Sequence, residues 1–214
     1  MFENYKAYLK FLDERLNKFF ERQKPYIFCK KGCAKCCKHA QFPYSLTEIS
    51  YLLNGVFDLD IEVQSIIEQN VHKTIEDKKN CKEDKFLYDC PFLVNNECVV
   101  YKYRGVVCRT FGLMSVGENS KIKVPFCYAK GLNYSNVMDK NGKEINIEKF
   151  KNLHVEEEPL AFNISYKFLT DSDFERGFNF KFGDKKPLID WFINDEKTKI
   201  KLTNYNKNFN RNRK

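Results

Sequence analysis

This sequence of 214 residues contains no long hydrophobic run. No stretch approaches the roughly 18 consecutive apolar residues that cross a bilayer. The first twenty residues, MFENYKAYLKFLDERLNKFF, carry a charge every few positions, so they lack the apolar segment of a secretory signal peptide. These absences exclude a membrane-spanning protein, and they lead us to expect a cytoplasmic protein with no membrane partner.

Motifs of several enzyme classes are also absent. No glycine-rich turn follows a first strand, which disfavours a doubly wound fold that binds S-adenosylmethionine. Strand and helix units do not alternate as the partial barrel of radical S-adenosylmethionine enzymes requires. Neither a Ser/His/Asp arrangement nor a pair of carboxylates stands out, and no internal repeat occurs. The sequence therefore identifies no catalytic residue.

What the sequence does contain is cysteine. Nine cysteines amount to about 4% of the chain, which is below the density of small secreted disulfide scaffolds, and the number is odd. Four of them lie within "CKKGCAKCC", from Cys29 to Cys37. We expect reduced thiols. Clustered thiols in a reducing compartment indicate metal or redox chemistry, because a buried free cysteine needs no neighbours of its own kind.

Spacing sorts most of these cysteines into two groups. The first group is Cys29, Cys33, Cys36 and Cys37, and the second is Cys90, Cys98 and Cys108 with Cys127 trailing. Zinc and iron–sulfur clusters both take four ligands and both accept thiolates, so eight cysteines suffice for two centres. Spacing alone does not assign ligands to centres. Adjacent Cβ atoms diverge, so Cys36 and Cys37 are expected to serve different centres unless one is not a ligand. Cys81 fits neither spacing, and we expect it not to bind metal.

The motifs "CKKGCAKCC" and "CPFLVNNECVVYKYRGVVCR", followed by a late cysteine, resemble the YkgJ-type cysteine-cluster family, which is described as a zinc- or iron-chelating domain. The resemblance covers Phe28 to Cys127. The matching positions are Cys29, Cys33, Cys36, Cys37, Cys90, Pro91, Phe92, Leu93, Cys98, Tyr101, Arg104, Cys108 and Arg109. It implies that the eight cysteines of the two groups are metal ligands, with Cys127 as the eighth. One departure is Gly105, where the family commonly has proline, and we expect it to loosen the following turn.

Basic side chains accompany the thiols. The first cysteine group is interleaved with Lys30, Lys31, Lys35 and Lys38. Four thiolates around Zn²⁺ leave two negative charges, which nearby ammonium groups would offset. Arg104 and Arg109 flank Cys108, and we predict that they bind the cofactor by hydrogen-bonding to cluster sulfides. The alternative is that each arginine pairs with an acid at the surface.

The expected function is metal binding, with an iron–sulfur cluster of the 4Fe-4S kind favoured over zinc. The family that the chain resembles includes the cysteine domain of flagellin lysine N-methylases, and C-x3-C-x2-C is also the triplet spacing of radical S-adenosylmethionine enzymes. One alternative is an enzyme of that methylase type, whose partner would be a protein substrate. Another is a zinc-stabilised module that binds nucleic acid or protein. The absence of a second C-x2-C knuckle disfavours nucleic acid.

We predict an α+β fold: one small metal-centred domain of amphipathic helices with a short β-hairpin and irregular loops, spanning residues 1–196 with a motif core at 28–127. Apolar spacing predicts helices over 2–19 and 60–79. A third helix is expected from a cap at Ser45 to a stop at Asn54 and Gly55. Two apolar runs around Asn95 and Asn96 predict the hairpin. The residues 197–214 contain seven Lys and Arg and no acid, so most of the net charge of +8 lies in an expected flexible tail.

Overall fold

The computed structural model describes residues 2–30, 32–117 and 120–193, so the predicted basic tail lies outside the described residues. The α+β prediction is confirmed, because helices alternate irregularly with sheets of only two or three strands. The helices are α1 Glu3–Arg22, η1 Lys24–Tyr26, η2 Lys35–Cys37, α2 Leu46–Phe57, α3 Ile61–Asn80, η3 Tyr101–Tyr103, α4 Val106–Thr110, η5 Phe126–Lys130, α5 Ile147–Leu153, α6 Tyr166–Leu169, α7 Ser172–Phe178 and α8 Asp190–Ile193. The strands are β1 Pro43–Ser45, β2 Leu93–Val94, β3 Glu97–Cys98, β4 Met114–Val116, β5 Ile122–Lys123, β6 Ala161–Phe162 and β7 Lys185–Pro187.

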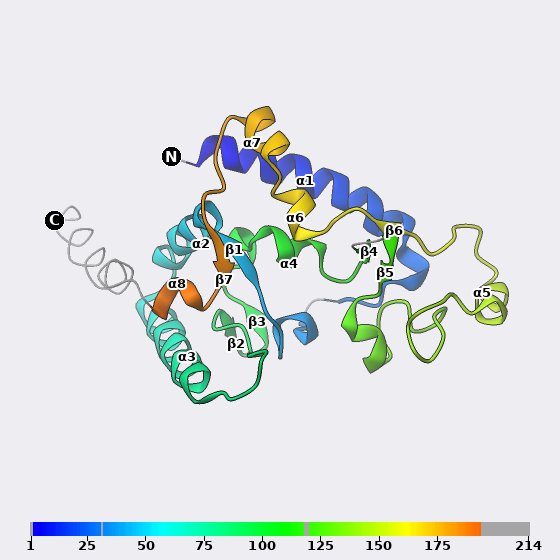
Figure 1. The fold of residues 1–214 in the computed structure, drawn as a ribbon, viewed down its shortest axis with the longest axis horizontal. Helices are drawn as coiled ribbons and strands as arrows, with labels where there is room; N and C mark the ends of the chain where they lie inside the picture. Colours follow the sequence, from blue (N-terminus) through cyan, green and yellow to red (C-terminus); the bar gives the residue numbers. More distant parts are fainter. Residues whose placement is uncertain (1, 31, 118–119, 194–214) are drawn as a thin grey trace.

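The three sheets join parts of the chain that are far apart in sequence. Strand β1 pairs antiparallel with β7, so a segment near residue 45 lies beside one near residue 185. Strand β4 pairs antiparallel with β5 and parallel with β6. The predicted hairpin is the third sheet, formed by β2 and β3. The stretch from 110 to 186 contains β4 to β6 and the helices η5, α5, α6 and α7, and α7 packs against α1 (Figure 1).

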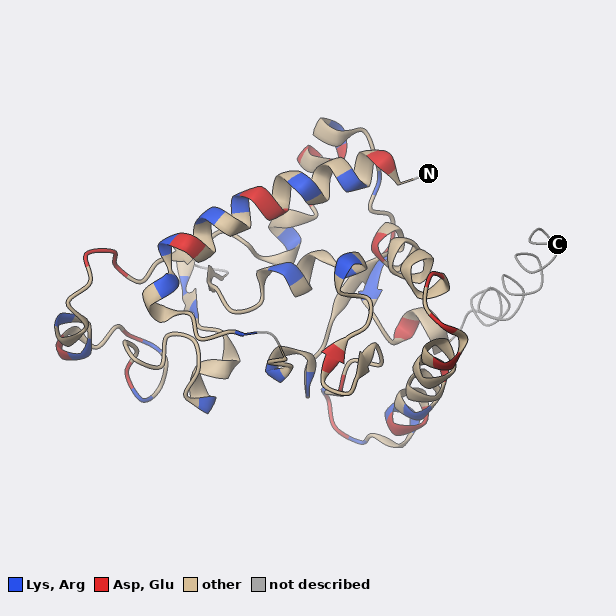
Figure 2. Ribbon diagram, turned by 180° about the vertical axis from the view of Figure 1, so that it is seen from behind, with Lys and Arg blue, Asp and Glu red and all other residues tan. Residues whose placement is uncertain are grey.

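Helix α1 confirms the amphipathic helix predicted over 2–19. Its buried face consists of Tyr5, Tyr8, Leu9, Leu12 and Leu16. Charged residues of both signs are interspersed along the same helix (Figure 2). The helix ends at Arg22, and Pro25 lies in the following turn η1, where it cannot continue an α-helix. The apolar periodicity therefore predicted both the helix and its buried face.

Helix α2 begins where its sequence predicted and ends later. The Ser45 side chain accepts from the Glu48 backbone N–H, and the Glu48 carboxylate accepts from the Ser45 backbone N–H, which is a capping box. The predicted stop at Asn54 and Gly55 is wrong, since the helix continues to Phe57. A Cβ atom on Gly55 would lie 2.2 Å from Cδ2 of Tyr103. Gly55 therefore permits a close packing contact and does not end the helix.

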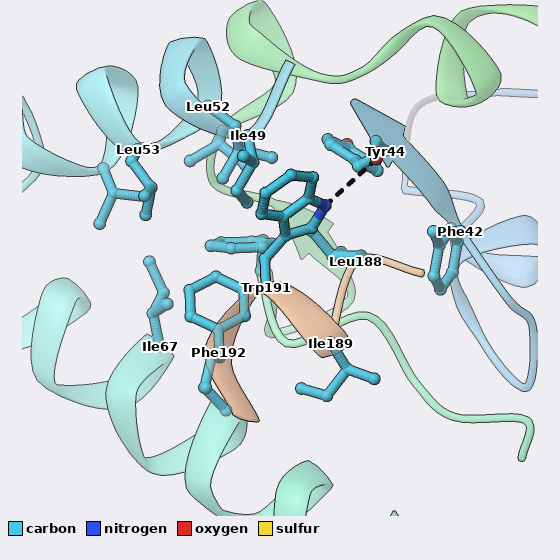
Figure 3. Packing of buried hydrophobic residues seen from close by; sticks show 14 of the residues in the cluster. Phe42, Tyr44, Ile49, Leu52, Leu53, Ile67, Leu188, Ile189, Trp191 and Phe192 are labelled. Atoms are coloured by element: carbon cyan, nitrogen blue, oxygen red, sulfur yellow. Dashed lines mark hydrogen bonds between the residues drawn. The ribbon is translucent and has the colours of Figure 1, made fainter. Parts of the chain in front are cut away.

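The largest core cluster joins α2 and α3 to the end of the described chain. Trp191 and Phe192 of α8 pack with Ile49 and Leu52 of α2 and with Ile67 of α3 (Figure 3). The Trp191 indole Nε1 donates a hydrogen bond of 3.1 Å to the Tyr44 carbonyl oxygen in β1. This packing fixes β1, which leads directly out of the cysteine-rich segment.

Two further core clusters complete the fold. One lies under α1 and includes Leu113, Phe162 and Phe182, and the other is formed around Tyr26, Met114 and Tyr134. The turn η2, with its cysteines, lies between the part that contains α3 and the hairpin and the part that contains β4 to β6 (Figure 1). Within the described ranges, no helix combines the length and the apolar character that crossing a membrane requires.

Candidate metal centre

Backbone contacts fix the turn η2 against the hairpin. The backbone N–H of Cys90 donates a hydrogen bond of 2.8 Å to the Cys37 carbonyl oxygen. Ala40 and Tyr88 form an isolated antiparallel bridge just beyond this contact. The Lys38 ammonium donates a hydrogen bond of 2.6 Å to the Asn96 side-chain oxygen in the hairpin turn. The first and second cysteine groups of the sequence therefore meet here, although about fifty residues, including α2 and α3, separate them along the chain.

The hairpin that carries Cys98 is confirmed. Its two central residues, Asn95 and Asn96, have φ of 51° and 63°, as a two-residue I′ turn requires. Asparagine tolerates this left-handed region better than most residues. Cys98 is the partner of Leu93 in the strand pair, so the turn fixes the position of its thiol relative to Cys90.

Helix α4 carries Cys108, and Tyr44 holds its first turn. The Gly105 backbone N–H donates a hydrogen bond of 2.9 Å to the Tyr44 hydroxyl, which lies 3.5 Å from the Cys108 sulfur. A Cβ atom on Gly105 would lie 2.6 Å from Cζ of Tyr44. Glycine therefore does not loosen this turn as we expected, because Tyr44 holds it. Proline here would remove the donor and collide with the ring.

Four thiols form one neighbouring group, which we call the hairpin thiols: Cys37, Cys90, Cys98 and Cys108. Burial raises the pKa of Cys90 well above its ordinary value, and the negative charges of the other three hairpin thiols add to the rise. Burial also raises the pKa of Cys108 to about 12, with contributions from Cys37 and Cys98. The pKa of Cys98 rises to about 11 through burial and the charge on Cys37. Each hairpin thiol is thus within electrostatic reach of the other three.

The remaining four predicted ligands form the second group, which we call the loop thiols: Cys29, Cys33, Cys36 and Cys127. Burial raises the pKa of Cys29, and the charge on Cys33 adds to it. Burial raises the pKa of Cys127 to about 11, and Cys29 and Cys33 both contribute. Cys36 interacts with Cys37 and Cys108 before Cys29, and we assign it to the loop thiols because it lines the same cavity as Cys127. Segments almost a hundred residues apart in the sequence therefore supply this group.

Cys36 and Cys37 lie at the boundary between the two groups. A hydrogen bond between their thiols raises the pKa of Cys36 and lowers that of Cys37. Cys108, one of the hairpin thiols, also raises the pKa of Cys36. The adjacent pair therefore links the groups, and Cys37 has the closer relation to the hairpin.

Cys81 lies apart from both groups. It follows α3 directly, and its sulfur lies 4.0 Å from the Glu83 carbonyl oxygen. Cys81 is not among the main causes of the pKa shifts of Cys29, Cys36, Cys37, Cys90, Cys98, Cys108 and Cys127. This position agrees with our prediction that Cys81 does not bind metal, which still awaits a test.

Asn133 positions the loop thiols, and sequence reasoning missed it. Its buried side chain donates to the Cys29 sulfur at 3.1 Å and to the Gly112 carbonyl oxygen at 2.9 Å. Its side-chain oxygen accepts a hydrogen bond of 2.8 Å from the Phe28 backbone N–H. No sequence signal beyond its place six residues after Cys127 could have indicated this role.

The two arginines that we predicted to bind the cofactor differ in their surroundings. The Arg109 guanidinium pairs with Asp13 and donates to the carbonyl oxygens of Arg104 and Lys102. These contacts correspond to the pairing alternative, although Arg109 is buried and not at the surface. Arg104 stacks on the Tyr101 ring at 3.9 Å, and its charge reaches Cys98 and opposes the rise in the pKa of that thiol. Cofactor binding remains a prediction for both residues, and Arg104 is the better placed.

Substitution of Gly112 tests the support of the loop thiols. Gly112 has φ of +101°, and a Cβ atom there would lie 2.8 Å from Nδ2 of Asn133 and 3.3 Å from the Cys29 sulfur. We expect Gly112→Ala to reduce the free energy of unfolding by about 2 kcal/mol or more, through backbone strain and displacement of Asn133. Denaturant unfolding of the purified protein measures this change.

The matched control is Gly177→Ala in α7. An added Cβ atom at Gly177 meets nothing within 4 Å, and the backbone is helical. Because alanine favours a helix, we expect this control to leave stability unchanged or raise it by up to about 1 kcal/mol. An equal loss of unfolding free energy in both variants would show that the close packing of Gly112 against Asn133 does not stabilise the protein.

In the part of the chain that the structure describes, no three His, Cys, Asp or Glu side chains are arranged as the ligand set of a metal ion. The thiols of each group are therefore neighbours without standing in coordination geometry. Comparison of the chain with protein-family models, curated proteins and solved structures gives no match. The resemblance to the YkgJ-type family accordingly stays a prediction from the motifs.

Proposed function

We propose that the protein binds metal through two centres, one held by the hairpin thiols and one by the loop thiols. The observation that carries this proposal is the convergence of eight cysteines in the fold: Cys37 lies against the hairpin, Cys29 lies with Cys33 and Cys127, Cys36 borders both groups, and Cys81 lies apart. Four thiolates are a full ligand set for zinc and for an iron–sulfur cluster. A packed core without a metal has no physical reason to gather thiols in fours.

The donor chemistry of the two groups fits such centres. The thiols of each group approach one another from different segments, so a metal bound between them would link β3, α4, η2 and η5. All the protein ligands of both centres would be thiolate sulfurs. Such soft ligands select Zn²⁺, iron or Cu⁺. The bound metal would supply either a structural crosslink or, as an iron–sulfur cluster, electron transfer. Binding requires each group to contract from its present arrangement into coordination geometry.

We favour an iron–sulfur cluster over zinc for two reasons. Cys29, Cys33 and Cys36 have the C-x3-C-x2-C spacing, and the motifs resemble a family that includes flagellin lysine N-methylases. Protein purified without oxygen is expected to be brown, to absorb broadly near roughly 400 nm, and to bleach in air as thiolates oxidise. Absorption spectra, with iron, zinc and acid-labile sulfide measured on the same sample, test this choice. Colourless anaerobic protein with two zinc ions per chain would keep metal binding and reject iron–sulfur chemistry. Protein free of bound metal would reject the whole proposal.

A further inference from the structure

A cavity of about 590 Å³ opens directly beside the loop thiols. Cys36 and Cys127 line it, whereas Cys37, Cys90, Cys98 and Cys108 do not. Its walls come from three stretches that converge on this point, residues 107–117, 123–127 and 163–167. The volume lies within the range of roughly 300 to 1,000 Å³ that small-molecule sites occupy. Of the two thiol groups, the loop group is therefore the one that a small molecule can approach through this cavity.

The walls of the cavity are largely apolar. Aliphatic and aromatic side chains contribute most of the lining, namely Val107, Phe111, Leu113, Val124, Phe126 and Ile164. Phe126 is 46% exposed, so this lining includes a large apolar side chain that the fold leaves partly uncovered. An apolar body entering the cavity would remove this surface from water, which is favourable by about 25 cal/mol per Å².

Two lysines border the same cavity, and neither has a charged partner among the residues that the structure describes. Lys123 in β5 and Lys167 in α6 both line it. Neither side chain forms an ion pair or a hydrogen bond with any other described residue, in contrast to Lys78, which pairs with Asp190, and Lys185, which donates to the Thr170 carbonyl oxygen. No acidic residue is among the described residues that line the cavity. The electrostatic complement of this site is a negative charge.

We propose that the cavity binds a small organic anion with an apolar body, held at its acidic group by Lys123 and Lys167 and placed against the loop thiols. The metal part of this proposal rests on the proposed function. It assigns different roles to the two centres: the loop thiols hold the centre that faces a ligand, and the hairpin thiols hold a structural centre. The binding of the anion itself depends only on the cavity and its two lysines.

Octanoate and octylamine are matched probes for this site, because they share an apolar chain and differ in the sign of their charge. Calorimetric titration of the full-length protein is expected to give saturable binding of octanoate and none of octylamine.

Replacement of both lysines, Lys123→Met with Lys167→Met, keeps the aliphatic stems and is expected to weaken octanoate binding at least about tenfold, through loss of charge-assisted contacts. The control Lys121→Met removes an exposed charge close in the chain but outside the cavity lining, and should bind octanoate as the unmodified protein does. Equal binding of the two probes, no saturable octanoate binding, or unchanged binding by the double variant would overturn the proposal. Octyl phosphate, titrated in parallel, distinguishes a phosphate from a carboxylate group.

The link to the loop centre has a separate readout. Octanoate is expected to shift the visible spectrum of iron-loaded or cobalt-substituted protein in the Cys98→Ser variant, where the loop thiols are intact. It should leave the spectrum of the Cys33→Ser variant unchanged. The opposite pattern would overturn the assignment of the two centres. Metal content measured on the same samples separates the two proposals: bound metal without octanoate binding rejects only the cavity, and octanoate binding by protein without metal rejects only the proposed function.

Discussion

Removal of the bound metal is expected to abolish the cooperative unfolding transition of this protein. The segments that carry the cysteines contain little regular structure, because β2 and β3 have two residues each and η2 is a single turn. A two-stranded hairpin of this size is marginal at best by itself. A structural metal contributes on the order of 10 kcal/mol, comparable with the whole stability of a domain. The loss should therefore extend beyond the metal sites.

Thermal unfolding monitored by circular dichroism, before and after treatment with a strong chelator, measures this effect. Metal analysis must show that the treated sample is fully stripped, and readdition of metal should restore the transition. Helix α1 carries none of the cysteines and packs against α7 and an apolar core cluster, so some helical signal is expected to persist in the stripped protein. An unchanged melting temperature in stripped protein would contradict the prediction.

Substitution of one cysteine in each group is expected to remove one centre at a time. Cys98→Ser alters the hairpin thiols and Cys33→Ser alters the loop thiols, so each should lower the metal content by about half if the two centres hold equal amounts. The combination of both substitutions should remove nearly all of it. The reason is the grouping of the thiols. Cys37 raises the pKa of Cys98, and Cys33 raises the pKa values of Cys29 and Cys127.

The matched control is Cys81→Ser, which should leave the metal content intact. Far-ultraviolet circular dichroism on each variant shows whether the chain is still folded when the metal is counted. If either single substitution in the two groups removed all the metal from a folded chain, the thiols would share one centre. A loss in Cys81→Ser comparable to that in Cys98→Ser would show that the cysteines are wrongly assigned.

Local patterns predicted much of the fold. Apolar spacing identified α1 and α3, the Ser45 and Glu48 pair identified the start of α2, and two asparagines identified the hairpin turn. The end of α2 could not be predicted in this way. Glycine after asparagine is typical of a helix end, but Gly55 is needed because the ring of Tyr103, 48 residues away in the sequence, packs directly against it. Local sequence contains no information about this tertiary contact, so the end of α2 could not be predicted from it.

The division of the cysteines depended on tertiary structure for the same reason. Spacing placed Cys37 with Cys29 and Cys127 with Cys90, whereas the fold places Cys37 with the hairpin and Cys127 with the loop. Asn133 connects Cys29 to the Gly112 backbone through two hydrogen bonds, and no motif in the sequence indicates this role. Likewise, the two lysines at the cavity lie 44 residues apart in unremarkable stretches of sequence.

Diffraction from anaerobically grown crystals, recorded at the iron and zinc absorption edges, tests the central claim most directly. Anomalous difference maps locate a bound metal independently of the protein coordinates. We predict two positions in each chain, one among Cys37, Cys90, Cys98 and Cys108 and the other among Cys29, Cys33, Cys36 and Cys127. A single anomalous position, or metal bound away from these eight sulfurs, would contradict the account.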